Sequence, residues 1–253
     1  MTAPSTPARP GLELSPLVRK VFAEFLGSLL LTATVVGSGI AAASLSPHDV
    51  GLELLENALV TGAALVALIL ALGPVSAAFN PVVTLAERVF GAISTGEATA
   101  FIAAQVVGCC AGTVLANVMF DLNAVSLSTH HRDTAGLWLG EVVATFGLLV
   151  VIFGVVRGGR APIVAFAVGG YITAAYWFTS STSFANPAIT LGRTLSDTFA
   201  GIAPSSVPMF VLMQLLGAAL ALAAVLVLYP DAAQVANDLT HLDSPPPIRQ
   251  DVA

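Results

Sequence analysis

The sequence predicts an all-α membrane protein in which six transmembrane helices and two re-entrant half-helices form an inverted repeat. This prediction rests on the composition, on six long apolar segments and on a polar Asn-Pro pair that occurs twice, which we call the Asn-Pro corner. Hydrophobic residues make up 56% of the 253 residues and charged residues only 9%, whereas soluble domains contain roughly 25% charged residues. So few charges cannot cover a water-facing surface, which indicates that the chain lies in a lipid bilayer.

Each of the six apolar segments is long enough, or nearly so, to cross a hydrocarbon core of about 30 Å. They cover residues 18–43, 54–73, 98–120, 137–156, 161–179 and 206–229. The first is longer than a signal-peptide core, so we expect it to be retained as a helix. We predict one membrane domain at 17–230, with repeats at 17–120 and 137–230, between disordered tails at 1–16 and 231–253.

Two shorter segments each contain an Asn-Pro pair: "AAFNPVVTLAERVFG" around Asn80 and "STSFANPAITLGRTLSD" around Asn186. They are too short to cross the membrane and too apolar for solvated loops. We expect both to be re-entrant half-helices, which are tolerated at membrane depth where they are buried in protein or line a wet cavity. Asn caps helix N-termini and Pro suits the first turn, so capping alone would explain one such pair. Two pairs at matching positions indicate a further role for the Asn amides.

The two halves of the chain resemble each other. The segment "AEFLGSLLLTATVVG" parallels "GEVVATFGLLVVIFG", which matches Glu24 with Glu141. Likewise "QVVG", beginning at Gln105, parallels "QLLG", beginning at Gln214. Because each half has an odd number of spans, the second copy must enter the membrane from the opposite side. The functional site of such an inverted repeat usually lies near the midplane between the halves.

Positive charges set the expected orientation. One side of the membrane would carry Arg9, Arg19, Lys20, Arg88, Arg157, Arg160 and Arg249, and the other only Arg132 and Arg193. Lys and Arg favour the cytoplasmic side. We therefore expect both termini to be cytoplasmic and the 44–53 and 121–136 loops to be external. The net charge of −6 is spread over loops and tails and suggests no nucleic-acid partner.

Half-helices that enter from opposite faces would bring their N-termini together near the midplane. Each terminus carries about half a positive charge, so the pair would repel cations, while a neutral solute with an acceptor oxygen could bond to the Asn amides. This chemistry favours a pore for small uncharged polar solutes. The spans contain no paired-His zinc motif and no nucleophile constellation. We therefore expect no enzyme activity, no cofactor and no metal site.

The paired Asn-Pro motifs, with "AEFLGS" and "GPVSAAFNPVVT", resemble those of the aquaporin and glycerol-facilitator (major intrinsic protein) family over residues 17–230. The resemblance implies an aquaporin-like homotetrameric channel in the cell membrane. Its solutes would be water, glycerol or undissociated metalloid acids such as arsenous acid. By the same resemblance, Glu24 and Glu141 would brace the re-entrant loops. The implied pore motifs are Asn80, Pro81 and Val82, and Asn186, Pro187 and Ala188.

The sequence departs from the family pattern at Val82, where relatives have Ala, and in the preceding loop, which is one residue short. The largest departure is Ile189, because relatives usually carry an Arg of the outer selectivity filter there. The remaining filter positions implied by the resemblance are Thr61 (with Val60 as the alternative), Ala174 and Ser183. These residues are small and include neither Arg nor His, which implies a wide filter.

Arg193 has two interpretations. It shares a helical face with Asn186 and Ile189, so it can reach the outer vestibule. The favoured interpretation is an i,i+4 ion pair with Asp197, or snorkelling at the membrane interface. Gln105 and its counterpart in the second half are also ambiguous between polar contacts that join helices and pore lining.

A secondary transporter is the main alternative function, because inverted repeats with broken helices are also typical of transporters. A transporter needs an ion-coupling carboxylate or a charged substrate site. Glu24 and Glu141 are the acidic residues that lie deep in the predicted spans, and a bracing role accounts for both. The channel is therefore the preferred prediction.

Overall fold

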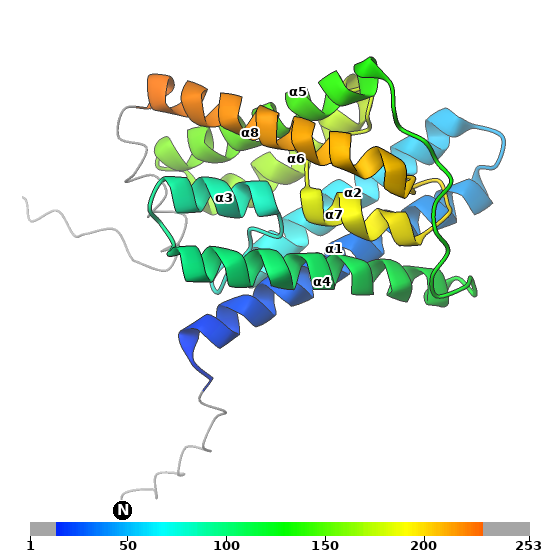
Figure 1. The fold of residues 1–253 in the computed structure, drawn as a ribbon, viewed down its shortest axis with the longest axis horizontal. Helices are drawn as coiled ribbons and strands as arrows, with labels where there is room; N and C mark the ends of the chain where they lie inside the picture. Colours follow the sequence, from blue (N-terminus) through cyan, green and yellow to red (C-terminus); the bar gives the residue numbers. More distant parts are fainter. Residues whose placement is uncertain (1–13, 230–253) are drawn as a thin grey trace, which may run out of the picture.

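The computed structural model describes residues 14–229, and these form helices and loops only. The predicted C-terminal tail at 231–253 lies outside the described residues, as do residues 1–13 of the predicted N-terminal tail. Long helices run across the molecule and enclose two short helices (Figure 1). The all-α fold class is therefore confirmed.

Six helices are long and apolar enough to cross a membrane, as predicted. They are α1 (Pro16–Leu45), α2 (Val50–Leu72), α4 (Thr95–Met119), α5 (Ala135–Arg157), α6 (Val164–Phe178), which follows the 3₁₀ turn η1 (Ala161–Ile163), and α8 (Val207–Leu228), which follows η3 (Pro204–Ser206). Helix α1 begins, and α8 ends, at the same side of the bundle (Figure 1). The chain is a multi-pass membrane protein.

The two short helices occupy the segments predicted as half-helices. They are α3 (Pro81–Val89) and α7 (Pro187–Gly192), and the 3₁₀ turn η2 (Arg193–Leu195) follows α7. Each begins directly after its Asn with Pro in the first turn, where the missing N–H is not needed. In Figure 1, α3 and α7 lie between α4 and α8, towards opposite sides of the molecule.

Matching helices pack together within each half: α4 lies against α1 in the first and α8 against α5 in the second, while α2 and α6 join the halves. Glycines permit the close approach. A Cβ at Gly108 would lie 2.5 Å from the carbonyl oxygen of Phe25, and a Cβ at Gly217 would lie 2.5 Å from that of Val142. These are the glycines of the paired "QVVG" and "QLLG" segments, and small residues at such positions let helix backbones meet in a membrane.

Candidate functional site

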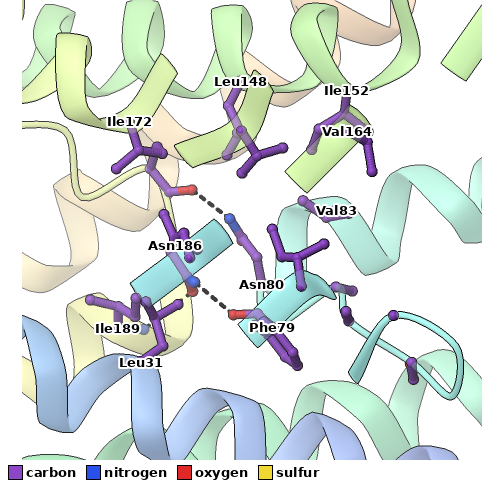
Figure 2. A pocket seen from close by; sticks show the side chains of 18 of the residues that line it. Leu31, Phe79, Asn80, Val83, Leu148, Ile152, Val164, Ile172, Asn186 and Ile189 are labelled. Carbon is purple, nitrogen blue, oxygen red and sulfur yellow. Dashed lines mark hydrogen bonds between the residues drawn. The ribbon is translucent and has the colours of Figure 1, made fainter. Parts of the chain in front are cut away.

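The two Asn-Pro corners meet through a reciprocal pair of hydrogen bonds. The Asn80 Nδ2 donates to the carbonyl oxygen of Ala185 at 2.8 Å, and the Asn186 Nδ2 donates to that of Phe79 at 2.8 Å. Figure 2 shows both bonds crossing between the half-helices. Each amide is thus held by the backbone of the opposite corner, and the two halves of the chain are joined at their centre.

The side-chain oxygen of each Asn caps its own half-helix. Asn80 Oδ1 accepts from the N–H of Val82 at 3.1 Å. Asn186 Oδ1 accepts from the N–H groups of Ala188 at 3.0 Å and Ile189 at 3.2 Å. Because the oxygen is engaged by the helix and one amide hydrogen by the opposite corner, the second hydrogen of each NH₂ group is left for a solute. Both Asn side chains line the central cavity.

The residue before each Asn adopts a left-handed backbone conformation, with φ of 48° at Phe79 and 47° at Ala185. This region is uncommon for non-glycine residues and costs on the order of 1–3 kcal/mol unless the surroundings hold it. The conformation directs each carbonyl at the opposing amide. Neither residue was singled out from the sequence, because backbone angles of this kind have no signature there.

Two buried carboxylates hold these strained corners. Glu24 and Glu141 are both fully buried. Glu24 accepts from the N–H groups of Ala78 and Phe79 at 2.8 Å each, and Glu141 from those of Phe184 and Ala185 at 2.9 Å each. Carboxylates are strong acceptors of such charge-assisted bonds. The two glutamates therefore lie where a bracing role requires, one on the first helix of each repeat.

A glutamine and a threonine complete each brace. Gln105 Nε2 donates to Thr84 Oγ1 and to the bracing glutamate of its own repeat, at 2.8 Å each. Gln214 Nε2 donates to Thr190 Oγ1 at 2.9 Å and to the other glutamate at 2.5 Å. Both glutamines thus join helices and do not line the cavity. Neither threonine was predicted from the sequence, although each stands four residues after its Asn in the paired segments "NPVVTL" and "NPAITL".

A continuous cavity runs past the Asn pair. It offers about 130 Å³ to the centres of water-sized molecules, which is room for several waters because one needs at least about 10–15 Å³ on this measure. Apolar side chains of α5 and α6 face the Asn amides across the cavity (Figure 2): Leu148, Ile152, Val164 and Ile172. A passage with donors on one wall and hydrocarbon on the other suits polar solutes without charge.

Three of the four predicted filter residues lie together along the cavity: Thr61, Ser183 and Ile189. The structure departs from the prediction at Ala174, which is exposed on the outer face of α6. Tyr176 lines the cavity instead, with its hydroxyl 3.3 Å from Thr61 Oγ1. Two residues along a helix rotate a side chain by about 200°, so a small error in position exchanged a lipid-facing Ala for a cavity-facing Tyr. The cavity therefore contains an aromatic ring beside the predicted filter residues, whereas the predicted filter had none.

Arg193 also differs from its favoured interpretation. The side chain is only 2% exposed and lines the cavity. Asp197 is engaged elsewhere in the described structure, because its carboxylate accepts from the Thr129 N–H at 2.8 Å and hydroxyl at 3.0 Å. These hydrogen bonds hold the pKa of Asp197 below its usual value. The expected Arg193–Asp197 ion pair is therefore absent from the described residues, and burial at the cavity excludes snorkelling.

Similarity to known proteins agrees with this geometry. The chain is 49% identical to the aquaglyceroporin AqpS of Rhizobium meliloti (strain 1021) over 82% of this chain and 88% of that protein. It is 30% identical to the aquaporin AqpM of Methanothermobacter marburgensis over 81% and 95%. The fold matches the X-ray structure of the aquaglyceroporin from Plasmodium falciparum with a TM-score of 0.65 at 19% identity, covering 86% and 99% of the two chains. The family model for major intrinsic proteins matches residues 12–162. The chain belongs to the major intrinsic protein family.

Proposed function

We propose that the protein is a passive transmembrane channel for small uncharged polar solutes, and that water and glycerol are its main solutes. The observation that carries this proposal is the reciprocal Asn80–Asn186 pair, whose amides line a cavity faced by apolar side chains. Such a site offers hydrogen bonds to a neutral solute. The similarity to proteins named aquaglyceroporins supports glycerol as a solute in addition to water.

We further propose that undissociated metalloid acids, such as arsenous acid, pass by the same route. They are small neutral polyols, and their hydroxyl groups would meet the same amides as those of glycerol. The two half-helix N-termini add fixed positive ends near the cavity centre, which opposes the passage of cations and protons. These are the properties of a channel for neutral solutes, without catalysis.

The decisive experiment is a stopped-flow panel on proteoliposomes containing purified protein, with water, glycerol, urea, boric acid and arsenous acid as solutes. Fluxes should exceed those of empty liposomes, rise linearly with the gradient, and be unaffected by a proton or sodium gradient. Saturable uptake that a proton gradient drives uphill would instead identify the secondary transporter. If neither water nor any of the solutes crossed faster than in empty liposomes, the proposal of a channel would be refuted.

We propose that both termini face the cytoplasm of a cell membrane. The uneven distribution of Lys and Arg supports the cytoplasmic side, and the position of the α1 start and the α8 end on one side supports a common side for the two termini. Single cysteines at Thr2 and Asn123, in a chain without Cys109 and Cys110, would test it. An impermeant reagent should label Asn123→Cys, which is on an exposed loop, in intact cells, and Thr2→Cys only after lysis. The reverse pattern would contradict the orientation.

We also propose a homotetramer with one pore in each subunit, on the basis of the family resemblance. Large apolar side chains exposed on the long helices, among them Leu59, Phe166 and Leu220, suit either lipid or a neighbouring subunit. Chemical cross-linking in native membranes should give species up to four subunits. A monomer alone, under conditions that preserve solute flux, would contradict the assembly.

A further inference from the structure

The outer end of the cavity contains a buried cation one turn beyond the position where the family usually places its filter Arg. Ile189 occupies the usual position, and Arg193 opens the 3₁₀ turn that follows α7. Both side chains line the same cavity as Asn186. The positive charge that the sequence lacks at 189 is therefore present in the passage, supplied by a different residue.

Arg193 is held in one orientation by its surroundings. Its Nε donates to the carbonyl oxygen of Ala200, and its guanidinium carbon lies 3.4 Å from the centre of the Phe184 ring. Phe184 is itself fixed, because its N–H donates to Glu141. A stacked guanidinium gains a cation–π interaction. The brace of the second corner thus also positions the arginine.

Most of the hydrogen-bonding capacity of Arg193 remains unused. A guanidinium has five N–H donors, and among the described residues the Ala200 carbonyl is the acceptor that the structure provides. Ser183 lines the same cavity, is 3% exposed, and its hydroxyl has no hydrogen-bond partner in the described structure. Buried polar groups without partners are rare and costly. A solute oxygen that reaches these groups in the cavity would supply the acceptor that each of them lacks.

We propose that Arg193 is the cation of the outer selectivity filter, and that with Ser183 it binds an acceptor oxygen of the passing solute. This inference rests on the proposed channel function. Arg193 lines the same cavity as Tyr176 and Thr61 and places a fixed positive charge in the passage. The solutes it favours are neutral molecules with a hydroxyl or oxo oxygen, and the ions it rejects are cations.

Arg132 provides a matched control. Its guanidinium carbon lies 5.0 Å from the centre of the same Phe184 ring, and its Nε donates to the Gly201 carbonyl at 3.1 Å. It is not among the residues that line the cavity. If Arg193 acts merely by stabilising the outer loops, the same substitution at the two arginines should have the same effect on selectivity.

The experiment measures glycerol and water permeability and K⁺ conductance in bilayers with equal amounts of inserted protein. Arg193→Ile should raise the glycerol-to-water ratio about tenfold, equivalent to about 1.4 kcal/mol, and should introduce a K⁺ conductance. Arg132→Ile should change neither. The double variant Ile189→Arg/Arg193→Ile, which moves the charge one turn inward, should abolish the K⁺ conductance again.

Three results would overturn the inference: an unchanged ratio in Arg193→Ile, equal effects at Arg132 and Arg193, or a K⁺ conductance that the relocated charge does not remove. If the Arg193→Ile protein does not insert into the bilayer, the Arg193→Lys variant tests the proposal instead. Lysine keeps the charge without the planar stack, so this variant should still exclude K⁺ but pass more glycerol, and an unchanged ratio would refute the proposal. A wild type that conducts no solute would refute the channel function itself, whereas a conducting wild type with unaffected Arg193 variants would refute only the filter role.

Discussion

The corner at Asn80 and the corner at Asn186 are built alike at the midplane and differ one turn further along each half-helix. Both amides donate to the opposite backbone at 2.8 Å, and the backbone N–H groups of both corners donate to a buried glutamate. Beyond this point α3 continues for 9 residues, whereas α7 ends after 6 and passes into a 3₁₀ turn. That early end positions Arg193 over Phe184 at the outer mouth. The inverted repeat thus fixes a common donor pair, while the proposed filter cation lies in a part that is not repeated.

The largest effect should follow removal of a brace. Glu24→Leu and Glu141→Leu each leave two buried N–H groups without an acceptor, at about 1–3 kcal/mol per group, next to a strained residue. We expect both variants to lose most of their folded, inserted protein, which thermal unfolding in detergent would measure. Each variant also leaves the Nε2 of its glutamine, Gln105 or Gln214, without the carboxylate acceptor. Glu56→Leu, which loses a single bond from Ser46, is the control and should remain folded.

The next effect tests the equivalence of the two amides. Asn80→Leu and Asn186→Leu should each abolish or sharply reduce water and glycerol flux, because each removes a donor at the cavity centre. Loss of a helix cap costs about 0.5–2 kcal/mol, and Asn186 caps two N–H groups where Asn80 caps one. Asn186→Leu should therefore unfold at the lower temperature. Normal flux through a well-inserted variant would exclude that amide from the solute path.

A third prediction concerns the point where the two corners diverge. Ile189→Arg should reduce glycerol and metalloid-acid flux more than water flux, because it narrows the outer cavity beside Arg193. An unpaired Arg at membrane depth costs about 2.5–3.5 kcal/mol on insertion scales, so fluxes must be normalised to inserted protein. The measurement is the glycerol-to-water permeability ratio against wild type. An equal ratio would mean that residue 189 does not limit the passage.

The last prediction concerns how each repeat accommodates its corner. A Cβ at Gly27 would overlap the ring of Phe79, whereas the second repeat has the small Ala185 at the corner and Ala144 three residues after its glutamate. Gly27→Ala should therefore lower stability by about 1–3 kcal/mol through overpacking. Gly170→Ala, in a helix with open space around the glycine, should be neutral or slightly stabilising.

A double-variant cycle would sharpen this last comparison. In a Phe79→Ala background, Gly27→Ala should cost little, because the ring that it would meet is gone. Thermal unfolding of the four proteins gives the coupling energy between the two positions. A full loss of stability from Gly27→Ala in both backgrounds would show that the ring is not what requires glycine.

Much of the architecture followed from the sequence. Apolar length located the six spans, because the hydrocarbon core imposes a minimum helix length. The repeated Asn-Pro pairs located both half-helices, because capping and proline geometry act within a few residues. Glu24 and Glu141 could be singled out because a carboxylate deep in a span is too costly to be there without a partner.

The tertiary structure decided what depends on contacts between distant segments. Which backbone groups meet each glutamate depends on residues 43 to 55 positions apart. Which carbonyl receives each Asn amide depends on residues 105 and 107 positions apart. Whether Ala174 or Tyr176 faces the cavity depends on the rotation of α6 about its axis. The mostly apolar sequence of this helix does not specify that rotation. Arg193 was misjudged for a related reason. Its spacing in the sequence predicted an ion pair with Asp197. In the fold, the Asp197 carboxylate accepts from Thr129, and the Arg193 guanidinium packs on the Phe184 ring.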